Sequence, residues 1–296
     1  MLNKAPIFVI GFQRGGTNIL TNLIASHPDV CALSRETHHV FYGKHSRPLE
    51  KWADRLRYLP ILVAARGHVF RPTSLSERNG LPRLVMRYAD WLLYRSRLAA
   101  DGDRAHERSN GAGALDGPAP RLLGKNVNGL ALATPVLAEM YPDATFVALV
   151  RNGLALCESY VRRGWTAAAF GRIYERVCQR MLQDAATRAN YHLVRFEEML
   201  ANPSSMIEKV YGYASLDMRL VAKFRLQAKQ SMDQQGRRTY TFGGERDRET
   251  RWFDLSHIES CFRKDVDENQ IARLGAQDRQ DFLRHAQPSV EALGYL

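Results

Sequence analysis

An apolar run that leads straight into a glycine-rich turn, FVIGFQRGGTN (residues 8–18), constrains the fold of this chain more than any other stretch. The residues before the turn are β-branched or aromatic, as in a central parallel strand that is buried on both faces. After the turn, apolar residues recur at helical spacing, at Ile19, Leu20, Leu23 and Ile24. A strand–loop–helix unit of this kind presents backbone N–H groups and the positive end of a helix dipole to an anion. The sequence therefore predicts an α/β domain with an anion site at its first loop.

Two later segments of the chain repeat this strand-then-helix pattern. Residues 145–150 (TFVALV) predict a second buried strand, and residues 153–164 predict the helix after it. Residues 191–196 predict a third strand, which is followed by a helix after Pro203. Alternating strands and helices favour a parallel sheet with helices on both faces. We therefore expect a three-layer, P-loop-like α/β fold with a helical insertion.

The predicted organisation is a single domain over residues 1–296. We expect its core at residues 1–43 and 122–214. An arginine-rich helical insertion is expected at residues 44–121, and a C-terminal helical and lid region at residues 215–296. The end of the insertion, 101–120, is polar and rich in glycine, alanine and proline, so we expect a mobile or disordered loop there.

Charge and cysteine usage narrow the classes of partner and location. Lysine and arginine outnumber aspartate and glutamate by 42 to 31, and the resulting net charge of +11 favours anionic partners. The four cysteines are widely spaced and contain no C-x-x-C pair, which predicts neither a zinc site nor a disulfide framework. The longest apolar runs are much shorter than the ~20 residues of a transmembrane helix. We therefore expect a cytoplasmic protein, with peripheral membrane contact left open.

Two predicted strands each end near an arginine. The first loop lacks the lysine of the nucleotide-binding motif G-x-x-x-x-G-K-[ST], which leaves a tight turn with a buried glycine pair as an alternative to a phosphate site. Arg151 follows the second strand, and Ser159 comes eight positions later on the predicted helix. The carboxyl ends of parallel strands form the ligand edge of an open α/β sheet. Two such arginines can hold two separate phosphates.

These segments resemble the sulfotransferases that use 3′-phosphoadenosine 5′-phosphosulfate (PAPS), especially the bacterial enzymes and the tyrosylprotein and carbohydrate sulfotransferases. QRGGTN (13–18) is similar to the family's P-R-S-G-T-T loop, and the spacing from Arg151 to Ser159 is similar to its R-D-x-x-x-x-x-x-S motif. Further similar segments follow in the family's order: RETHHVF (35–41), LLGKNVN (122–128), YPDATFVALVRNG (141–153) and LVRFEEMLANP (193–203). The sequence departs from the family's pattern at four positions, Gln13, Gly15, Asn18 and Asn152. None of these departures removes a positive charge.

The resemblance implies a role for each matching residue. The residues implied to bind the 5′-phosphosulfate are Arg14, Gly15, Gly16, Thr17 and Asn18, and those implied to bind the 3′-phosphate are Arg151 and Ser159. Arg14 and Lys125 are the candidate cations at the bridging oxygen of the leaving nucleotide, where negative charge builds during transfer. Glu36 is the candidate base for the acceptor, with His38 or His39 as the alternative. The implied donor is PAPS, its product is adenosine 3′,5′-bisphosphate, and no metal is required.

The implied activity is transfer of a sulfuryl group from PAPS to a hydroxyl or amine on a carbohydrate, lipid or other small metabolite. A P-loop-type nucleotide-dependent phosphotransferase is an alternative with the same fold, which the missing lysine disfavours. A non-catalytic basic binding protein acting through residues 44–108 is a third hypothesis, but no nucleic-acid motif supports nucleic acid as a partner. The sequence identifies neither the acceptor nor the oligomeric state. We expect residues 44–121 and 234–254 to form the acceptor site and its lid.

Overall fold

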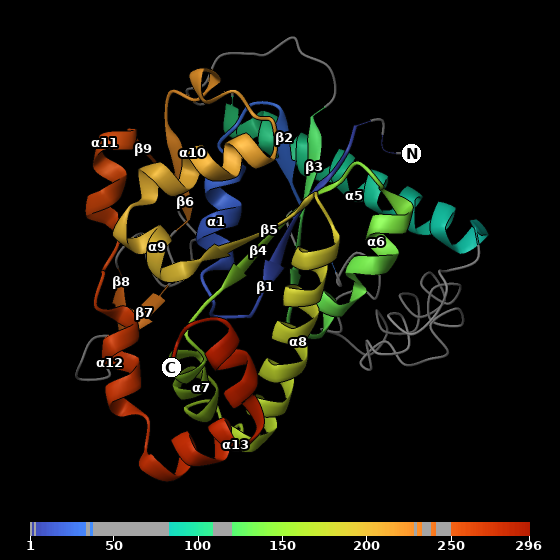
Figure 1. Cartoon of the computed structure of the whole chain (residues 1–296). Helices are drawn as coiled ribbons and strands as arrows, with labels where there is room; N and C mark the ends of the chain where they lie inside the picture. Colours follow the sequence, from blue (N-terminus) through green and yellow to red (C-terminus); the bar gives the residue numbers. More distant parts are fainter. Residues whose placement is uncertain are drawn as a thin grey trace, which may run out of the picture.

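A computed structural model describes residues 2, 4–33, 36–37, 83–108, 120–227, 230–232, 238–240 and 250–296 of the chain. Within these ranges, five parallel strands form one sheet in the order β2-β3-β1-β4-β5 (Figure 1). In chain order the strands are β1 (Ile7–Gly11), β2 (Val30–Ala32), β3 (Arg121–Val127), β4 (Thr145–Val150) and β5 (Tyr191–Arg195). The expected parallel α/β sheet is therefore confirmed.

Strand β1 lies at the centre of the sheet, between β3 and β4. Ile10 of β1 is paired with Asn126 on one side and with Ala148 on the other. Every residue of β1 and of β4 is buried, as expected for central parallel strands. The chain leaves β1 toward β2 on one side and later enters β4 on the other, so the connections diverge at the carboxyl end of β1. Open α/β sheets bind their ligands at such a point.

Helices cover both faces of the sheet and complete three layers (Figure 1). Successive residues of a strand point to opposite faces, so Ile7 and Val9 join one apolar cluster and Phe8 and Ile10 join the other. The helices of the first cluster are α1 (Thr17–Ile24), α9 (Phe196–Ala201) and α10 (Pro203–Tyr213). Those of the second include α5 (Arg83–Arg108), α8 (Ala167–Thr187) and α13 (Ala276–Ala292).

The remaining elements connect these layers or follow them in the chain. Between β3 and α8 the chain forms η1 (Asn128–Ala133), α6 (Thr134–Met140) and α7 (Gly153–Val161). After α10 it forms η2 (Met218–Leu220), α11 (Leu255–Ile258), η3 (Glu259–Cys261) and α12 (Val266–Arg273). Two small antiparallel pairs join β6 (Phe224–Gln227) to β9 (Thr250–Phe253) and β7 (Gln230–Met232) to β8 (Arg238–Tyr240).

Several local features differ from the sequence-based expectation. The sequence does not predict β2, which is short, or β3, which carries the polar residues Lys125 and Asn126. Residues 101–108 belong to α5, so the prediction of a loop is wrong for them. The stretch 234–254, which is expected to contribute to the acceptor site and its lid, contains the strands β8 and β9. Residues 38–82 and 109–119, which make up most of the predicted insertion, lie outside the described residues.

The structure also describes the features related to disulfide bonds, metal binding and membrane insertion. All four cysteines are free: Cys31, Cys157 and Cys178 are buried, and Cys261 is partly exposed. In the part of the chain that the structure describes, no cluster of His, Cys, Asp or Glu side chains could hold a metal ion. No helix within that part combines the length and the hydropathy that crossing a bilayer requires.

Candidate active site

The residues predicted from sequence gather at the carboxyl edge of the sheet. The first loop follows β1, Lys125 lies near the end of β3, and Arg151 directly follows β4. Glu36 comes after β2 in the chain, and its carboxylate reaches Lys125. The alternative bases, His38 and His39, lie outside the described residues.

Left-handed backbone conformations shape the first loop. Gly16 caps α1 with a φ of 87°, and Arg14 has a φ of 68°, which residues other than glycine seldom adopt. The Gly15 N–H donates to the Phe12 carbonyl at 3.0 Å and closes the turn. No side chain among the described residues caps α1, so the N–H groups of its first turn point to a place where an anion can bind. The loop therefore fits the phosphate contact predicted for it.

Asn128, the first residue of η1, hydrogen-bonds to the first loop. Its Oδ1 accepts from the Gln13 N–H at 3.0 Å and from the Tyr160 hydroxyl at 2.9 Å. Burial raises the pKa of Tyr160 to about 12, so the hydroxyl keeps its proton at neutral pH and can donate to Asn128. Asn128 itself has a left-handed φ of 54°. Sequence reasoning missed Asn128 and Tyr160, because an amide and a phenol that hold a loop form no recognisable spacing.

Lys125 links the loop to the candidate base. Its Nζ lies 3.1 Å from Glu36 Oε1 and also donates to Asn18 Oδ1. The Lys125 and Glu36 side chains are 16% and 18% exposed, so water and salt screen their ion pair less than they would on an open surface. The ammonium group thus stands between a residue of the anion loop and a carboxylate that can accept a proton.

Three arginines concentrate positive charge beside the loop. Burial lowers the pKa of Arg14, and the charges of Arg163 and Arg162 lower it further. Glu158 pairs with Arg162 at 3.2 Å, and the remaining positive charge of the group suits a ligand with several negative charges. Sequence reasoning missed Arg162 and Arg163. Their signal is the RRG segment that begins three positions after Ser159.

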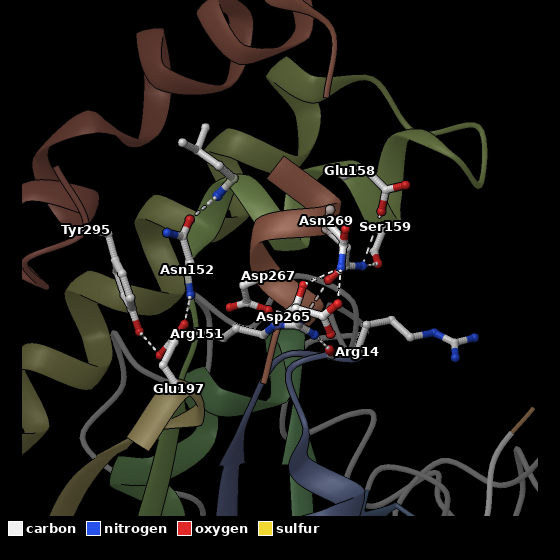
Figure 2. A network of polar contacts seen from close by, with 12 residues as sticks. Arg14, Arg151, Asn152, Glu158, Ser159, Glu197, Asp265, Asp267, Asn269 and Tyr295 are labelled. Atoms are coloured by element: carbon white, nitrogen blue, oxygen red, sulfur yellow. Dashed lines mark hydrogen bonds and ion pairs between the residues drawn. The ribbon is translucent and has the colours of Figure 1, made fainter. Parts of the chain in front are cut away.

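Arg151 and Ser159 lie close together through contacts with α12. Arg151 donates to Asp267 Oδ1 from Nε at 2.9 Å and from Nη2 at 2.5 Å (Figure 2). Gln270 accepts from Arg151 through Oε1 and donates from Nε2 to Ser159 Oγ at 2.7 Å. Arg151 Nη1 donates to the Arg14 carbonyl, whereas the Arg14 side chain extends away from this network (Figure 2). The two arginines therefore present separate guanidinium groups.

An aromatic ring lies between the loop and Arg151. The Arg151 Cζ atom is 4.2 Å from the centroid of the Phe196 ring, a distance at which cation and ring attract. A Cβ atom added to Gly16 would overlap Cδ2 and Cε2 of the same ring. Glycine at this position is therefore required both by the positive φ and by the closeness of Phe196.

Asn152 and Glu197 fix the turn between β4 and α7. Asn152 Oδ1 accepts from the Leu154 N–H at 2.9 Å and caps α7, which is a role that asparagine fills as well as aspartate. The Asn152 N–H donates to Glu197 Oε1, and the Tyr295 hydroxyl donates to Glu197 Oε2, both at 2.8 Å (Figure 2). Burial and then the neighbouring Asp267 raise the pKa of Glu197.

A family model described as "Sulfotransferase family" matches residues 6–219 of the chain. The chain belongs to the sulfotransferase family. A protein-tyrosine sulfotransferase of Drosophila melanogaster is 23% identical to this chain in an alignment of 220 residues that covers 70% of this chain and 37% of the fly protein. The chain thus spans well under half the length of that relative.

Solved sulfotransferase structures are also similar to this sulfotransferase. STF1 from Mycobacterium tuberculosis H37Rv is 20% identical, with 73% of this chain and 68% of that chain covered and a TM-score of 0.42. A sulfotransferase domain from the curacin biosynthetic pathway is 12% identical, with 100% and 99% covered and a TM-score of 0.48. The match establishes the family, and the activity, the donor and the acceptor are left to be argued from the site.

Proposed function

We propose that this sulfotransferase moves the sulfuryl group of PAPS to a hydroxyl or amine acceptor. The observation that carries the proposal is the place of Lys125, which contacts Asn18 and lies 3.1 Å from Glu36. One cation is thereby within reach of the loop proposed to hold the donor and of the carboxylate proposed to receive the acceptor's proton.

Two groups of residues would hold the two ends of the donor. The backbone of Gly15–Asn18 and the positive charge of Arg14 suit the 5′-phosphosulfate, because the loop offers N–H groups at a helix N-terminus. Arg151 and Ser159 suit the 3′-phosphate, because Gln270 contacts both of them, Arg151 just after the neighbouring strand β4 and Ser159 on the helix α7 that follows. The Arg14 side chain extends away from them (Figure 2), as suits a ligand with two phosphate groups.

The proposed chemistry relies on positioned charges rather than on a metal ion. PAPS supplies an activated sulfuryl group whose leaving oxygen belongs to adenosine 3′,5′-bisphosphate. Glu36 would accept the proton of the attacking hydroxyl as the oxygen bonds to sulfur. Lys125 and Arg14 would stabilise the negative charge that remains on the departing oxygen when its bond to sulfur breaks.

The acceptor and the location are further parts of the proposal. We propose a hydroxyl of a carbohydrate, lipid or small metabolite, bound with the help of residues 44–121 and 234–254. The name of the fly relative adds a protein tyrosine to the acceptors worth testing. Four free cysteines support a reducing, cytoplasmic location.

Calorimetry with adenosine 3′,5′-bisphosphate, adenosine 5′-phosphosulfate and ATP, each with and without Mg²⁺, tests the choice of donor. A hydrogen bond to a charged group contributes about 1.5–3 kcal/mol, so a nucleotide without the 3′-phosphate should bind at least about tenfold more weakly. Mg²⁺ should leave the affinities for adenosine 3′,5′-bisphosphate and adenosine 5′-phosphosulfate unchanged. Tight, Mg²⁺-dependent binding of ATP would support the phosphotransferase hypothesis instead.

Transfer itself is tested with sulfur-labelled PAPS and a panel of carbohydrate, lipid, phenolic and tyrosine-peptide acceptors. Lys125→Met should lower turnover on any active acceptor by about 10²–10³-fold, as expected when one group that stabilises developing charge is lost. Lys209→Met, which removes an exposed lysine from α10, is the matched control and should leave turnover unchanged. Equal turnover of the two variants would refute the role of Lys125.

A further inference from the structure

The guanidinium group of Arg151 already uses most of its hydrogen-bonding capacity. A guanidinium has five N–H donors, and Arg151 donates twice to Asp267, once to Gln270 and once to the Arg14 carbonyl. The Arg151 side chain is only 5% exposed. A phosphate group could therefore bind Arg151 only by replacing some of these partners.

The helix that contacts Arg151 also covers Ser159. Gln270 donates to Ser159 Oγ at 2.7 Å and to Glu158 Oε2 at 3.2 Å, and Ser159 is buried. Asp267 and Gln270 lie one turn apart on α12, so they share one face of that helix. A single helix face thus contacts both residues proposed for the 3′-phosphate.

The Asp267 carboxylate already contacts the Arg151 guanidinium. Asp267 Oδ2 is buried and accepts no hydrogen bond within the described ranges. Asp267 also contributes to the raised pKa of the Glu197 carboxyl group. A phosphate added at Arg151 would bring more negative charge against both carboxyl groups. Like charges repel strongly where burial limits screening. The Asp267 carboxylate and a phosphate are therefore mutually exclusive partners of Arg151.

The packing of α12 permits such an exchange. Its buried residues are Asp267 and Gln270, both polar, whereas Val266 and Ile271 are only partly buried. Polar contacts hold this helix against Arg151 and Ser159, while Val266 and Ile271 pack against the two apolar clusters. A phosphate that takes over the polar contacts can release the Asp267 and Gln270 face of α12 without exposing a fully buried apolar side chain of that helix.

We infer that Asp267 and Gln270 compete with the 3′-phosphate for Arg151 and Ser159 and leave these two residues when the nucleotide binds. This inference rests on the proposed function, which assigns the 3′-phosphate to Arg151 and Ser159. Asp267 thereby determines nucleotide affinity, because it competes with the donor on entry. It also favours product release, because its pair with Arg151 forms again as the product leaves and keeps a buried cation compensated.

Calorimetry on an Asp267→Asn variant tests the competition. The variant keeps the shape of the side chain and removes its charge, so its affinity for adenosine 3′,5′-bisphosphate should rise by about tenfold. Its affinity for adenosine 5′-monophosphate, which has no 3′-phosphate, should stay within about twofold. Asp265→Asn neutralises a carboxylate that pairs with Arg263 just before the same helix, and as the control it should change neither affinity.

The possible failures are distinguishable. Weaker or unchanged binding of the bisphosphate to Asp267→Asn would overturn the inference, because the carboxylate would then support the bound state or have no part in it. Equal affinity of the unsubstituted protein for the bisphosphate and the monophosphate would instead refute the assignment of Arg151 and Ser159 in the proposed function.

Hydrogen exchange of the unsubstituted protein gives a test that needs no variant to fold. The amides of α12 should exchange faster with adenosine 3′,5′-bisphosphate bound than without it, because the helix loses its contacts to Arg151 and Ser159. Adenosine 5′-monophosphate should leave their exchange unchanged. Slower exchange of α12 with the bisphosphate bound would overturn the inference.

Discussion

Gly16→Ala should destabilise the protein through two separable effects. Alanine at the φ of 87° found at Gly16 costs about 1–2 kcal/mol, because the left-handed conformation brings Cβ close to the following carbonyl. The added Cβ would also overlap the Phe196 ring, which is buried and lies against Arg151. Overpacking of a buried site costs about 1–3 kcal/mol. The free energy of unfolding should therefore fall by about 2–5 kcal/mol.

Gly164 provides the control for the backbone effect. Its φ is 86°, nearly that of Gly16, but a Cβ added there meets no atom within 4 Å. Gly164→Ala should therefore cost only the conformational part, about 1–2 kcal/mol. Urea denaturation of both variants gives the two free energies. Equal losses would refute the argument that Phe196 restricts Gly16.

A second substitution tests the contact directly. In the double variant Gly16→Ala/Phe196→Leu, the smaller side chain leaves room for the new methyl group. The cycle of single and double variants should give a favourable coupling of about 1–3 kcal/mol, because neighbours that overlap do not act independently. Additive losses would show that the ring moves aside freely.

Three further outcomes follow from the site. Glu36→Gln should keep nucleotide affinity measured by calorimetry and lose about 10²–10⁴-fold in turnover, as for a lost general base, and wild-type turnover would remove Glu36 from that role. Asn128→Ala should lower the free energy of unfolding by about 1–3 kcal/mol and raise the donor KM, because the buried Tyr160 hydroxyl loses its acceptor, whereas Asn128→Asp keeps one. The raised pKa of Glu197 means that the folded protein holds this proton to higher pH than the unfolded chain, so stability is lost as pH rises above the usual glutamate value of about 4.3. In urea denaturation, the free energy of unfolding should therefore fall less from acid to neutral pH for Glu197→Gln than for the unsubstituted protein. Parallel pH dependences of the two proteins would contradict this role of Glu197.

The central strands and the first loop follow well from local sequence. Residues 145–150 form β4 with the predicted bounds, because a run of six apolar and β-branched residues between turn signals suits only a buried strand. The sequence does not predict β3, because this strand places Lys125 and Asn126 at the site end of the sheet, where polar function overrides apolar patterning. The family resemblance, rather than periodicity, pointed to Lys125 and Glu36 as candidates, and their catalytic roles stay predictions.

The contacts of α12 have no local signal in the sequence. Asp267 and Gln270 look like ordinary polar residues of a surface helix, and their partners Arg151 and Ser159 lie more than 100 positions earlier in the chain. Only the docking of the C-terminal region against α7 reveals that they are buried. The loop is expected at 101–120, but its first part, 101–108, continues helix α5. The sequence does not predict this continuation, because the wider stretch is rich in glycine and alanine.

Two long-range contacts of the first loop have a consequence for the order of folding. The Gln13 N–H is held by Asn128, 115 positions later, and the Arg14 carbonyl by Arg151, 137 positions later. Contacts between such distant residues form late, because the intervening chain must first be ordered. On the ribosome, β1 and α1 emerge early, but residues that hold the loop in its left-handed conformation emerge only with η1 and the end of β4. We therefore expect a nascent chain to contain the residues of β1 and α1 well before it gains affinity for a nucleotide.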